Sequence, residues 1–301
     1  MADSNTAKSN TLKAVIATLT GFFFLASISL LVKLEIAGGA SIEWVVFMQY
    51  FTCLVIISIL ASKYKFRDLK TTKIKYHVIR GITGILAFTF FVIAVSEIPL
   101  VNANLLNNTA PLFIPILTIF WLKSKIDGKI WWGILIGFIG IVLILDPTDG
   151  NFFELGDMFG IGAGLLLAFA FVALGILTKT ESFITILFYY SLIAFTLSLP
   201  FAIANWSNPP LLIWIYAVLT GVLFISYLYL LQYAYRYVSV VKLSPLNFSV
   251  VIFAGILDWL FYGHVPGFSS LIGIVLVITG GILALTLHQK KNPHIKHHWH
   301  F

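Results

Sequence analysis

The sequence predicts an all-α integral membrane protein with ten transmembrane helices in two inverted five-helix repeats. Composition, a succession of apolar stretches and an internal similarity predict this fold. Of the 301 residues, 59% are hydrophobic and 10% are charged, whereas a soluble domain carries roughly 25% charged residues. One soluble core of this size cannot hide so many apolar side chains. Composition therefore excludes a soluble globular domain, a disordered chain and a nucleic-acid-binding domain.

The apolar stretches are about 20 residues long, which is the length that crosses a bilayer as a helix. They do not alternate in polarity as the strands of membrane barrels do, so each is expected to be a helix. The expected spans are 14–34, 42–62, 76–96, 101–121, 130–147, 157–177, 184–204, 211–233, 241–262 and 268–288. The chain then divides into an N-terminal tail (1–13), a first repeat (14–147), an outer linker (148–156), a second repeat (157–288) and a basic, His-rich tail (289–301).

Charge sets the expected orientation. If the N-terminus lies inside, 18 of the 19 Lys and Arg residues fall on the inner side, and Lys33 is the exception. The outer connections instead carry acids such as Glu35 and Asp157. Inner loops of membrane proteins are enriched in Lys and Arg. Both termini are therefore expected in the cytoplasm, with the protein in the cell (inner) membrane.

The two halves of the chain resemble each other. A shift of 140 residues brings Gly81 onto Gly221 and Asn107 onto Asn247 without a gap. Because each copy holds five spans, an odd number, the second copy would enter the membrane upside down. Inverted repeats of this kind are typical of secondary transporters, which alternate between two packings that open to opposite sides. The repeat therefore predicts transport by alternating access.

Polar side chains inside the expected spans are the candidates for substrate binding. They are Asn104, Asn107, Asn108, Asn247, Gln49, Gln232 and Tyr227. Amides in hydrocarbon need hydrogen-bond partners, so these residues either line a substrate cavity or tie neighbouring helices together. Tyr227 either packs against its neighbours or encloses a flat or apolar substrate, with its hydroxyl fixing the orientation.

Ionisable and helix-breaking residues suggest coupling and gating. Asp258 is the acid expected deepest inside a span, where a charge is costly and usually functional; otherwise it lies near the outer headgroups. We expect it to couple transport to protons or another ion. Pro111 and Pro115 cannot donate backbone hydrogen bonds, which favours a kink and a gate. Lys33 either attracts a substrate carboxylate or extends to the membrane interface.

Signatures of other chemistries are missing from the sequence. It contains no phosphate-binding Gly-x-x-x-x-Gly-Lys-Ser/Thr loop and no Gly-x-Ser-x-Gly or His-Glu-x-x-His motif. A lipid-modifying enzyme would need a convergent acid, base and nucleophile. We therefore expect neither an enzyme nor a cofactor, and no metal site in the membrane. The His-rich tail either binds metal or forms a basic end near anionic lipid headgroups.

A family motif is distributed over both halves. In the first half it comprises Arg80–Gly81, Gly84, Ala94–Leu100, Ala103, Thr109–Leu112, Gly133, Gly137 and Gly140. In the second half it comprises Gly221, Ala234, Pro245, Trp259–Leu260, Gly273 and Gly280–Gly281. On these residues the chain resembles the EamA domain of the drug/metabolite transporter superfamily, over about 13–287. The resemblance implies a ten-helix metabolite carrier.

The chain departs from that family pattern at three places. Many relatives carry Gly-Glu where Lys123–Ser124 and Gly263–His264 stand here, and Arg where Gln49 stands. Any role of those family charges therefore does not transfer to this chain. Lys33 matches a basic residue that is common at the end of the first helix in the family.

The expected function is secondary transport of a small polar organic metabolite, with an amino acid or a similar zwitterion favoured. The expected partners are this metabolite, the lipid bilayer and protons or another ion, and no nucleic acid. Whether the carrier forms a homodimer stays open. The alternative function is a non-transporting membrane sensor or assembly partner.

Overall fold

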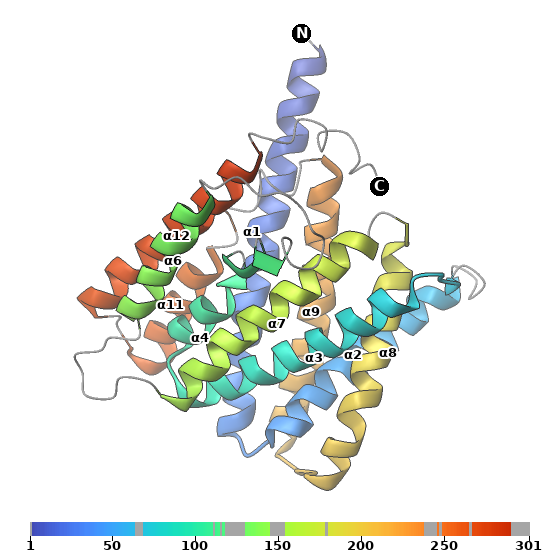
Figure 1. The fold of residues 1–301 in the computed structure, drawn as a ribbon. Helices are drawn as coiled ribbons and strands as arrows, with labels where there is room; N and C mark the ends of the chain where they lie inside the picture. The colour runs from blue at the N-terminus through green and yellow to red at the C-terminus, as the bar shows by residue number, and fades with distance from the viewer. Residues whose placement is uncertain are drawn as a thin grey trace.

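The computed structural model describes residues 2–63, 69–110, 112–114, 116–117, 130–144, 154–177, 180–237, 246, 249–264 and 267–289. This described part of the chain contains helices and no strand (Figure 1). The helices are α1 (Ala2–Ala37), α2 (Ile42–Lys63), α3 (Ile74–Glu97), α4 (Leu100–Asn107), α6 (Ile130–Ile144), α7 (Leu155–Leu177), α8 (Phe183–Ala204), α9 (Leu211–Tyr237), α11 (Ser249–Tyr262) and α12 (Phe268–Gln289).

The helices have the length and surface of membrane spans. Within the described residues, 6 helices are long and apolar enough to cross a bilayer, namely those that contain Thr11–Ala37, Ile42–Ser62, Ile74–Glu97, Leu155–Leu177, Phe183–Ala204 and Leu211–Leu231. Large apolar side chains also face outward, among them Leu211 at 76% exposed and Phe268 at 80% exposed. A continuous apolar exterior would drive a soluble protein to aggregate, but in a bilayer it contacts lipid. The chain is therefore an integral membrane protein.

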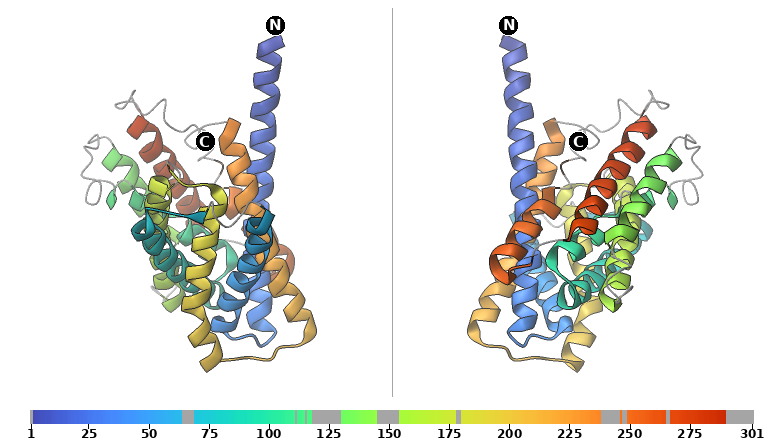
Figure 2. Two further views of the ribbon diagram at one scale, coloured as in Figure 1. Left: turned by 90° about the vertical axis from the view of Figure 1, so that its right-hand side faces the viewer. Right: turned by 90° about the vertical axis from the view of Figure 1, so that its left-hand side faces the viewer.

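Helices that are far apart in the sequence pack along one another. α1 lies against α9, α3 against α7, α2 against α8, and α6 against α12. The α6–α12 pair forms one flank of the molecule in Figure 1, while α2 and α8 lie toward the opposite flank. The N-terminal end of α1 projects beyond the other helices (Figure 2). These pairs join the first half of the chain to the second half.

One expected span differs from the helices observed, and the beginning of another cannot be compared with them. The expected span 101–121 begins as α4, which ends at Asn107, and Asn108 and Thr109 form a turn. The backbone N–H of Thr109 donates to the carbonyl oxygen of Leu106, three residues back, and helical residues resume at Ala110 and 112–114. The expected span 241–262 contains α11 (Ser249–Tyr262), and its residues 241–245, 247 and 248 lie outside the described part of the chain. The other expected spans agree with observed helices, although several of these extend further, α1 most of all.

Glycine allows the closest of these helix contacts, between α6 and α12. A Cβ atom on Gly280 would lie 2.6 Å from the carbonyl oxygen of Gly133, and one on Gly140 would lie 2.7 Å from the carbonyl oxygen of Gly273. The two backbones therefore touch directly. Such small-residue contacts are the usual means of helix association in lipid, where the hydrophobic effect does not drive helices together.

We expect Gly280→Val to lower the apparent thermal unfolding midpoint of the purified protein in detergent. The added side chain would force α6 and α12 apart, and overpacking of this kind costs about 1–3 kcal/mol. Gly267→Ala is the matched control, because a Cβ on Gly267 would meet nothing within 4 Å. An unchanged midpoint in Gly280→Val would show that the close contact does not stabilise the fold.

Candidate functional site

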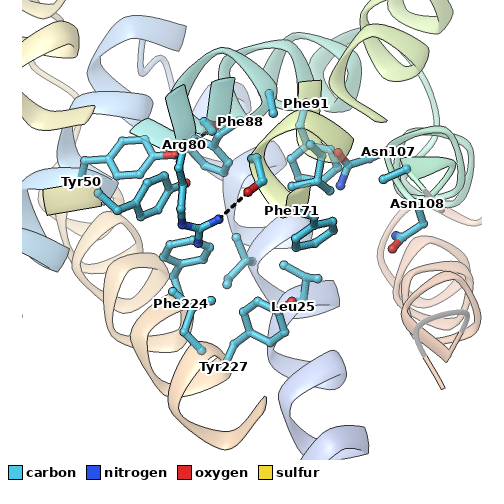
Figure 3. A pocket seen from close by; sticks show the side chains of 18 of the residues that line it. Leu25, Tyr50, Arg80, Phe88, Phe91, Asn107, Asn108, Phe171, Phe224 and Tyr227 are labelled. Atoms are coloured by element: carbon cyan, nitrogen blue, oxygen red, sulfur yellow. Dashed lines mark hydrogen bonds between the residues drawn. The ribbon is translucent and has the colours of Figure 1, made fainter. Parts of the chain in front are cut away.

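A cavity of about 110 Å³ lies where α1, α2, α3, α4, α7, α8 and α9 meet. Most of its wall is aromatic or aliphatic, and its polar groups come from a few side chains (Figure 3). The lining residues are Phe22, Leu25, Ile28, Tyr50, Arg80, Gly84, Ala87, Phe88, Phe91, Asn107, Asn108, Ala110, Leu167, Ala170, Phe171, Tyr190, Phe224, Tyr227 and Leu228. An apolar pocket with a few convergent polar groups is the usual form of a small-molecule site.

Arg80 is the charged residue of this cavity. Its side chain extends from α3 and is only 6% exposed. One terminal nitrogen, Nη1, donates a hydrogen bond of 3.4 Å to the carbonyl oxygen of Ala170 on α7, and the guanidinium carbon lies 4.7 Å from the centre of the Tyr190 ring. The inner nitrogen, Nε, is buried and has no partner among the described residues. The described residues therefore satisfy the hydrogen-bond donors of Arg80 only in part.

Two tyrosines form the wall beside Arg80. The hydroxyls of Tyr50 on α2 and Tyr190 on α8 are joined by a hydrogen bond of 2.9 Å, and their rings meet edge to face at 5.5 Å. Tyr190 can approach α3 because the neighbouring position there is Gly84. Figure 3 shows Tyr50 and Arg80 on one side of the cavity, with Asn107 and Asn108 on the other side.

Among the expected substrate-binding residues, three line the cavity: Asn107, Asn108 and Tyr227. Asn108 also donates 2.8 Å to the carbonyl oxygen of Asn104. Asn104 itself is not a lining residue. Its amide nitrogen donates to Ser29 Oγ at 2.9 Å and to the Leu100 carbonyl oxygen at 2.8 Å, so it ties α4 to α1.

The remaining expected residues do not line the cavity or cannot be located. Gln49 is buried in α2, and neither its amide nitrogen nor its amide oxygen has a partner among the described residues. Gln232 belongs to α9, but its side chain lies outside the described part of the structure. Asn247, Pro111 and Pro115 also lie outside the described residues.

A second polar group, which we name the Asp258 cluster, contains Lys33, Asp258, Tyr262 and His264. Asp258 on α11 is 0% exposed, and its Oδ1 lies 3.3 Å from His264 Nδ1. Its other oxygen has no partner in the described chain. Lys33 Nζ lies 4.8 Å from the centre of the Tyr262 ring, and it donates 3.2 Å to the Ile98 carbonyl oxygen between α3 and α4. The cluster therefore connects α1, α11 and the α3–α4 connection.

Two acids expected in outer connections are buried in helices instead. Glu35 is 1% exposed in α1, and its Oε1 accepts 2.7 Å from Thr220 Oγ1 on α9. Asp157 is buried in the first turn of α7. Counting charges between apolar runs missed both, because each lies just inside a helix end, where packing rather than composition decides burial.

Sequence reasoning also missed Arg80 and Tyr50 as cavity residues. Arg80 was counted with the basic inner connection, although it lies six residues inside α3. The sequence did contain evidence that Arg80 lies within a helix. His77, Arg80, Gly81 and Gly84 are spaced by three or four residues, which places them on one helical face. The small residues on that face indicate that it packs against another helix rather than facing solvent.

A solved crystal structure shares this fold, with a TM-score of 0.59 at 20% identity, and the match covers 95% of this chain and 98% of the other. Three curated relatives are similar in sequence. An S-adenosylmethionine uptake transporter of Rickettsia bellii is 26% identical, over 82% of this chain and 84% of its own. A pseudopaline exporter of Pseudomonas aeruginosa is 24% identical, over 68% and 72%. A riboflavin transporter of Vibrio cholerae is 24% identical, over 86% and 89%.

The model of the EamA-like transporter family matches this chain twice, over residues 12–146 and 154–286. Together the two matches span nearly the whole chain, and the similar proteins are named as transporters rather than enzymes. The chain therefore belongs to the EamA-like transporter family, as a membrane transporter and not an enzyme.

Proposed function

We propose that this transporter is a secondary carrier that moves a small polar organic metabolite across a bacterial inner membrane by alternating access. The observation that carries the proposal is the aromatic cavity, in which Arg80, Asn107, Asn108 and Tyr227 converge between helices of the two halves. Similar proteins are named for S-adenosylmethionine, pseudopaline and riboflavin, which are all small organic solutes. Within this class we favour an amino acid or a similar zwitterion.

The pattern of helix contacts supports two inverted halves of five spans each. The proposal pairs α1 with α7, α2 with α8, α3 with α9, α4 with α11 and α6 with α12. Exchanging the members of each pair turns the α3–α7 contact into α9–α1, the α2–α9 contact into α8–α3 and the α4–α7 contact into α11–α1, and all of these contacts occur. The contacts α2–α8, α4–α11 and α6–α12 map onto themselves and also occur. Inverted repeats allow such a carrier to open to either side.

The Asp258 cluster is the proposed coupling site. Asp258 is fully buried, one of its oxygens has no partner among the described residues, and a neighbouring Lys33 interacts with it electrostatically. Buried acids of this kind in membrane helices commonly carry protons or bind cations. With the N-terminus in the cytoplasm, as the distribution of Lys and Arg favours, the cluster would lie toward the outer face. It would therefore join the two halves when the carrier is closed to the outside.

The proposed gate is the segment after α4. α4 ends at Asn107, and Pro111 and Pro115 follow within eight residues. Prolines interrupt the ladder of backbone hydrogen bonds, so a helix bends more easily there. Because Asn107 and Asn108 line the cavity, a bend at this segment would change access to it.

We expect Tyr227→Phe to weaken substrate binding by about 2–10-fold without lowering the unfolding midpoint. The change removes the hydroxyl that faces the cavity but keeps the ring, and one neutral hydrogen bond contributes about 0.5–1.5 kcal/mol. The measurement is exchange of labelled solute into preloaded proteoliposomes, which does not depend on transport direction. Amino acids, S-adenosylmethionine and riboflavin are the solutes to screen.

Tyr229→Phe is the matched control, because Tyr229 lies on the same helix but is exposed on the outer surface. Saturable exchange that Tyr227→Phe weakens and Tyr229→Phe does not supports a carrier that uses this cavity. Saturable binding without any exchange would instead support the sensor.

We expect Asp258→Asn to abolish accumulation driven by a proton or sodium gradient while leaving solute exchange intact. Asparagine keeps the size of the side chain but can neither carry a proton nor present a negative charge to a cation. The measurement compares gradient-driven uptake with exchange in the same proteoliposomes. Glu154→Gln, a change at an exposed acid, is the control. Undiminished gradient-driven accumulation in Asp258→Asn would remove Asp258 from the coupling role.

A further inference from the structure

Arg80 has more hydrogen-bonding capacity than the protein uses. A guanidinium carries five N–H donors, yet within the described chain the assigned acceptor is the Ala170 carbonyl oxygen, at 3.4 Å. This distance is long for an N–H···O bond. Nε is buried without a partner. A buried donor without an acceptor destabilises the folded protein. A contribution to stability therefore does not explain why Arg80 is buried here.

The charge of Arg80 also lacks a counterion in the described part of the structure. The groups beside it are uncharged tyrosines: the Tyr190 ring lies 4.7 Å from the guanidinium carbon, and the Tyr190 hydroxyl is hydrogen-bonded to that of Tyr50. Asp258 lies against His264 instead, outside the cavity lining. The face of the Tyr190 ring stabilises the cation partly, as cation–π contacts do. A full positive charge nevertheless remains in an apolar cavity.

An acidic group would complete this site. A carboxylate accepts two parallel hydrogen bonds from a guanidinium, and it supplies the missing negative charge. The linked hydroxyls of Tyr50 and Tyr190 lie beside the same guanidinium. Asn107 and Asn108 lie on the other side of the cavity in Figure 3, and the lining rings of Phe91 and Phe171 lie between them and Arg80. The cavity is therefore charged at one side, polar at the other and apolar in between.

We propose that Arg80 binds the acidic group of the transported solute, so that the carrier selects small organic acids and zwitterions with an apolar or ring-shaped body. The proposal rests on the proposed function, because it assigns a substrate class to the same cavity. It excludes uncharged solutes and simple organic cations as preferred substrates. Arg80 acts by direct contact with the acid, and the aromatic wall takes the body of the solute.

Three probes that share a phenylpropyl body test the proposal: 3-phenylpropanoate, L-phenylalanine and L-phenylalaninamide. The first two carry a carboxylate and the third does not. Their affinities for the purified full chain are measured from the shift of the unfolding midpoint, because a ligand that binds the folded state raises it. We expect both acids to bind at millimolar concentration or below and the amide to bind at least about tenfold more weakly.

Substitutions at Arg80 test whether its side chain is the group that binds the acid. Arg80→Gln should weaken both acids by about tenfold or more, since it removes the charge and the paired donors. Arg80→Lys should bind them with intermediate affinity, since it keeps the charge but not the planar fork. Lys75→Gln is the matched control, because it removes a positive charge from an exposed position on the same helix. That variant should bind the probes as the wild type does.

A structural role for Arg80 makes different predictions. If Arg80 served to tie α3 to α7, Arg80→Gln would lower the unfolding midpoint of the ligand-free protein and leave the preference for acids over the amide intact. Under our proposal the ligand-free midpoint stays the same or rises, because an uncompensated buried charge has been removed. Equal binding of acids and amide, absence of binding by either acid, or an unchanged acid affinity in Arg80→Gln would each overturn the proposal.

Failure of this assignment differs from failure of the proposed function. If exchange of an uncharged solute depends on Tyr227 but not on Arg80, the proposed carrier function and its cavity are supported. The proposed specificity for acids is then contradicted. If no solute in the wider screen is exchanged and no cavity substitution alters binding, the proposed carrier function itself is contradicted.

Discussion

The close approach of α3 to α8 is the constraint on which the cavity depends. A Cβ atom on Gly84 would lie 2.5 Å from the Tyr190 ring, and one on Gly81 would lie 2.6 Å from Cγ2 of Ile193. Because glycine occupies both positions, the Tyr190 ring lies against α3 and beside the guanidinium of Arg80. A larger residue at position 84 would displace the ring and break its hydrogen bond to Tyr50. Helix packing therefore decides how the buried charge is accommodated.

The first helix connects the two polar regions of the molecule. Leu25 and Ile28 of α1 line the cavity, and Lys33 of the Asp258 cluster follows five residues after Ile28, about 7–8 Å further along the helix axis. α1 is also joined to α9 by the hydrogen bond from Thr220 to Glu35. In the proposed cycle, a displacement of the α1–α9 pair would therefore act on the cavity and on the coupling cluster together.

The sequence predicted the helical membrane fold well because its main signals are local. A run of apolar residues has to form a helix in lipid, whatever its neighbours are. The starts of α7, α8, α9 and α12 agree with the expected spans within two residues. The early end of α4 is less accessible to such reasoning, because Asn107 ends the regular helix within an apolar run that continues beyond it.

The site was less predictable because it depends on contacts between distant helices. Asn104 and Asn108 have the same side chain and lie one turn apart, yet Asn104 meets Ser29 on α1 and Asn108 lines the cavity. Nothing in the local sequence separates these two outcomes. Arg80 was assigned to an inner connection by its charge, although the packing of α3 against α7 and α8 buries it. Tyr227 could be named in advance because only its residue type and depth in a span were needed.

Several buried polar atoms without protein partners lie on helices at contacts between the two halves. Among the described residues they include Glu35 Oε2 on α1, Gln49 Nε2 and Oε1 on α2, Arg80 Nε on α3 and Asp258 Oδ2 on α11. Each leaves its contact less stable than a fully satisfied or fully apolar one would be. A carrier that alternates between two packings needs halves that are not locked in either one, because a deep minimum would trap it. In the proposed alternating-access cycle, the incomplete satisfaction of these groups would keep either packing from becoming too stable, and at Arg80 the bound acid would supply a partner that the described residues do not.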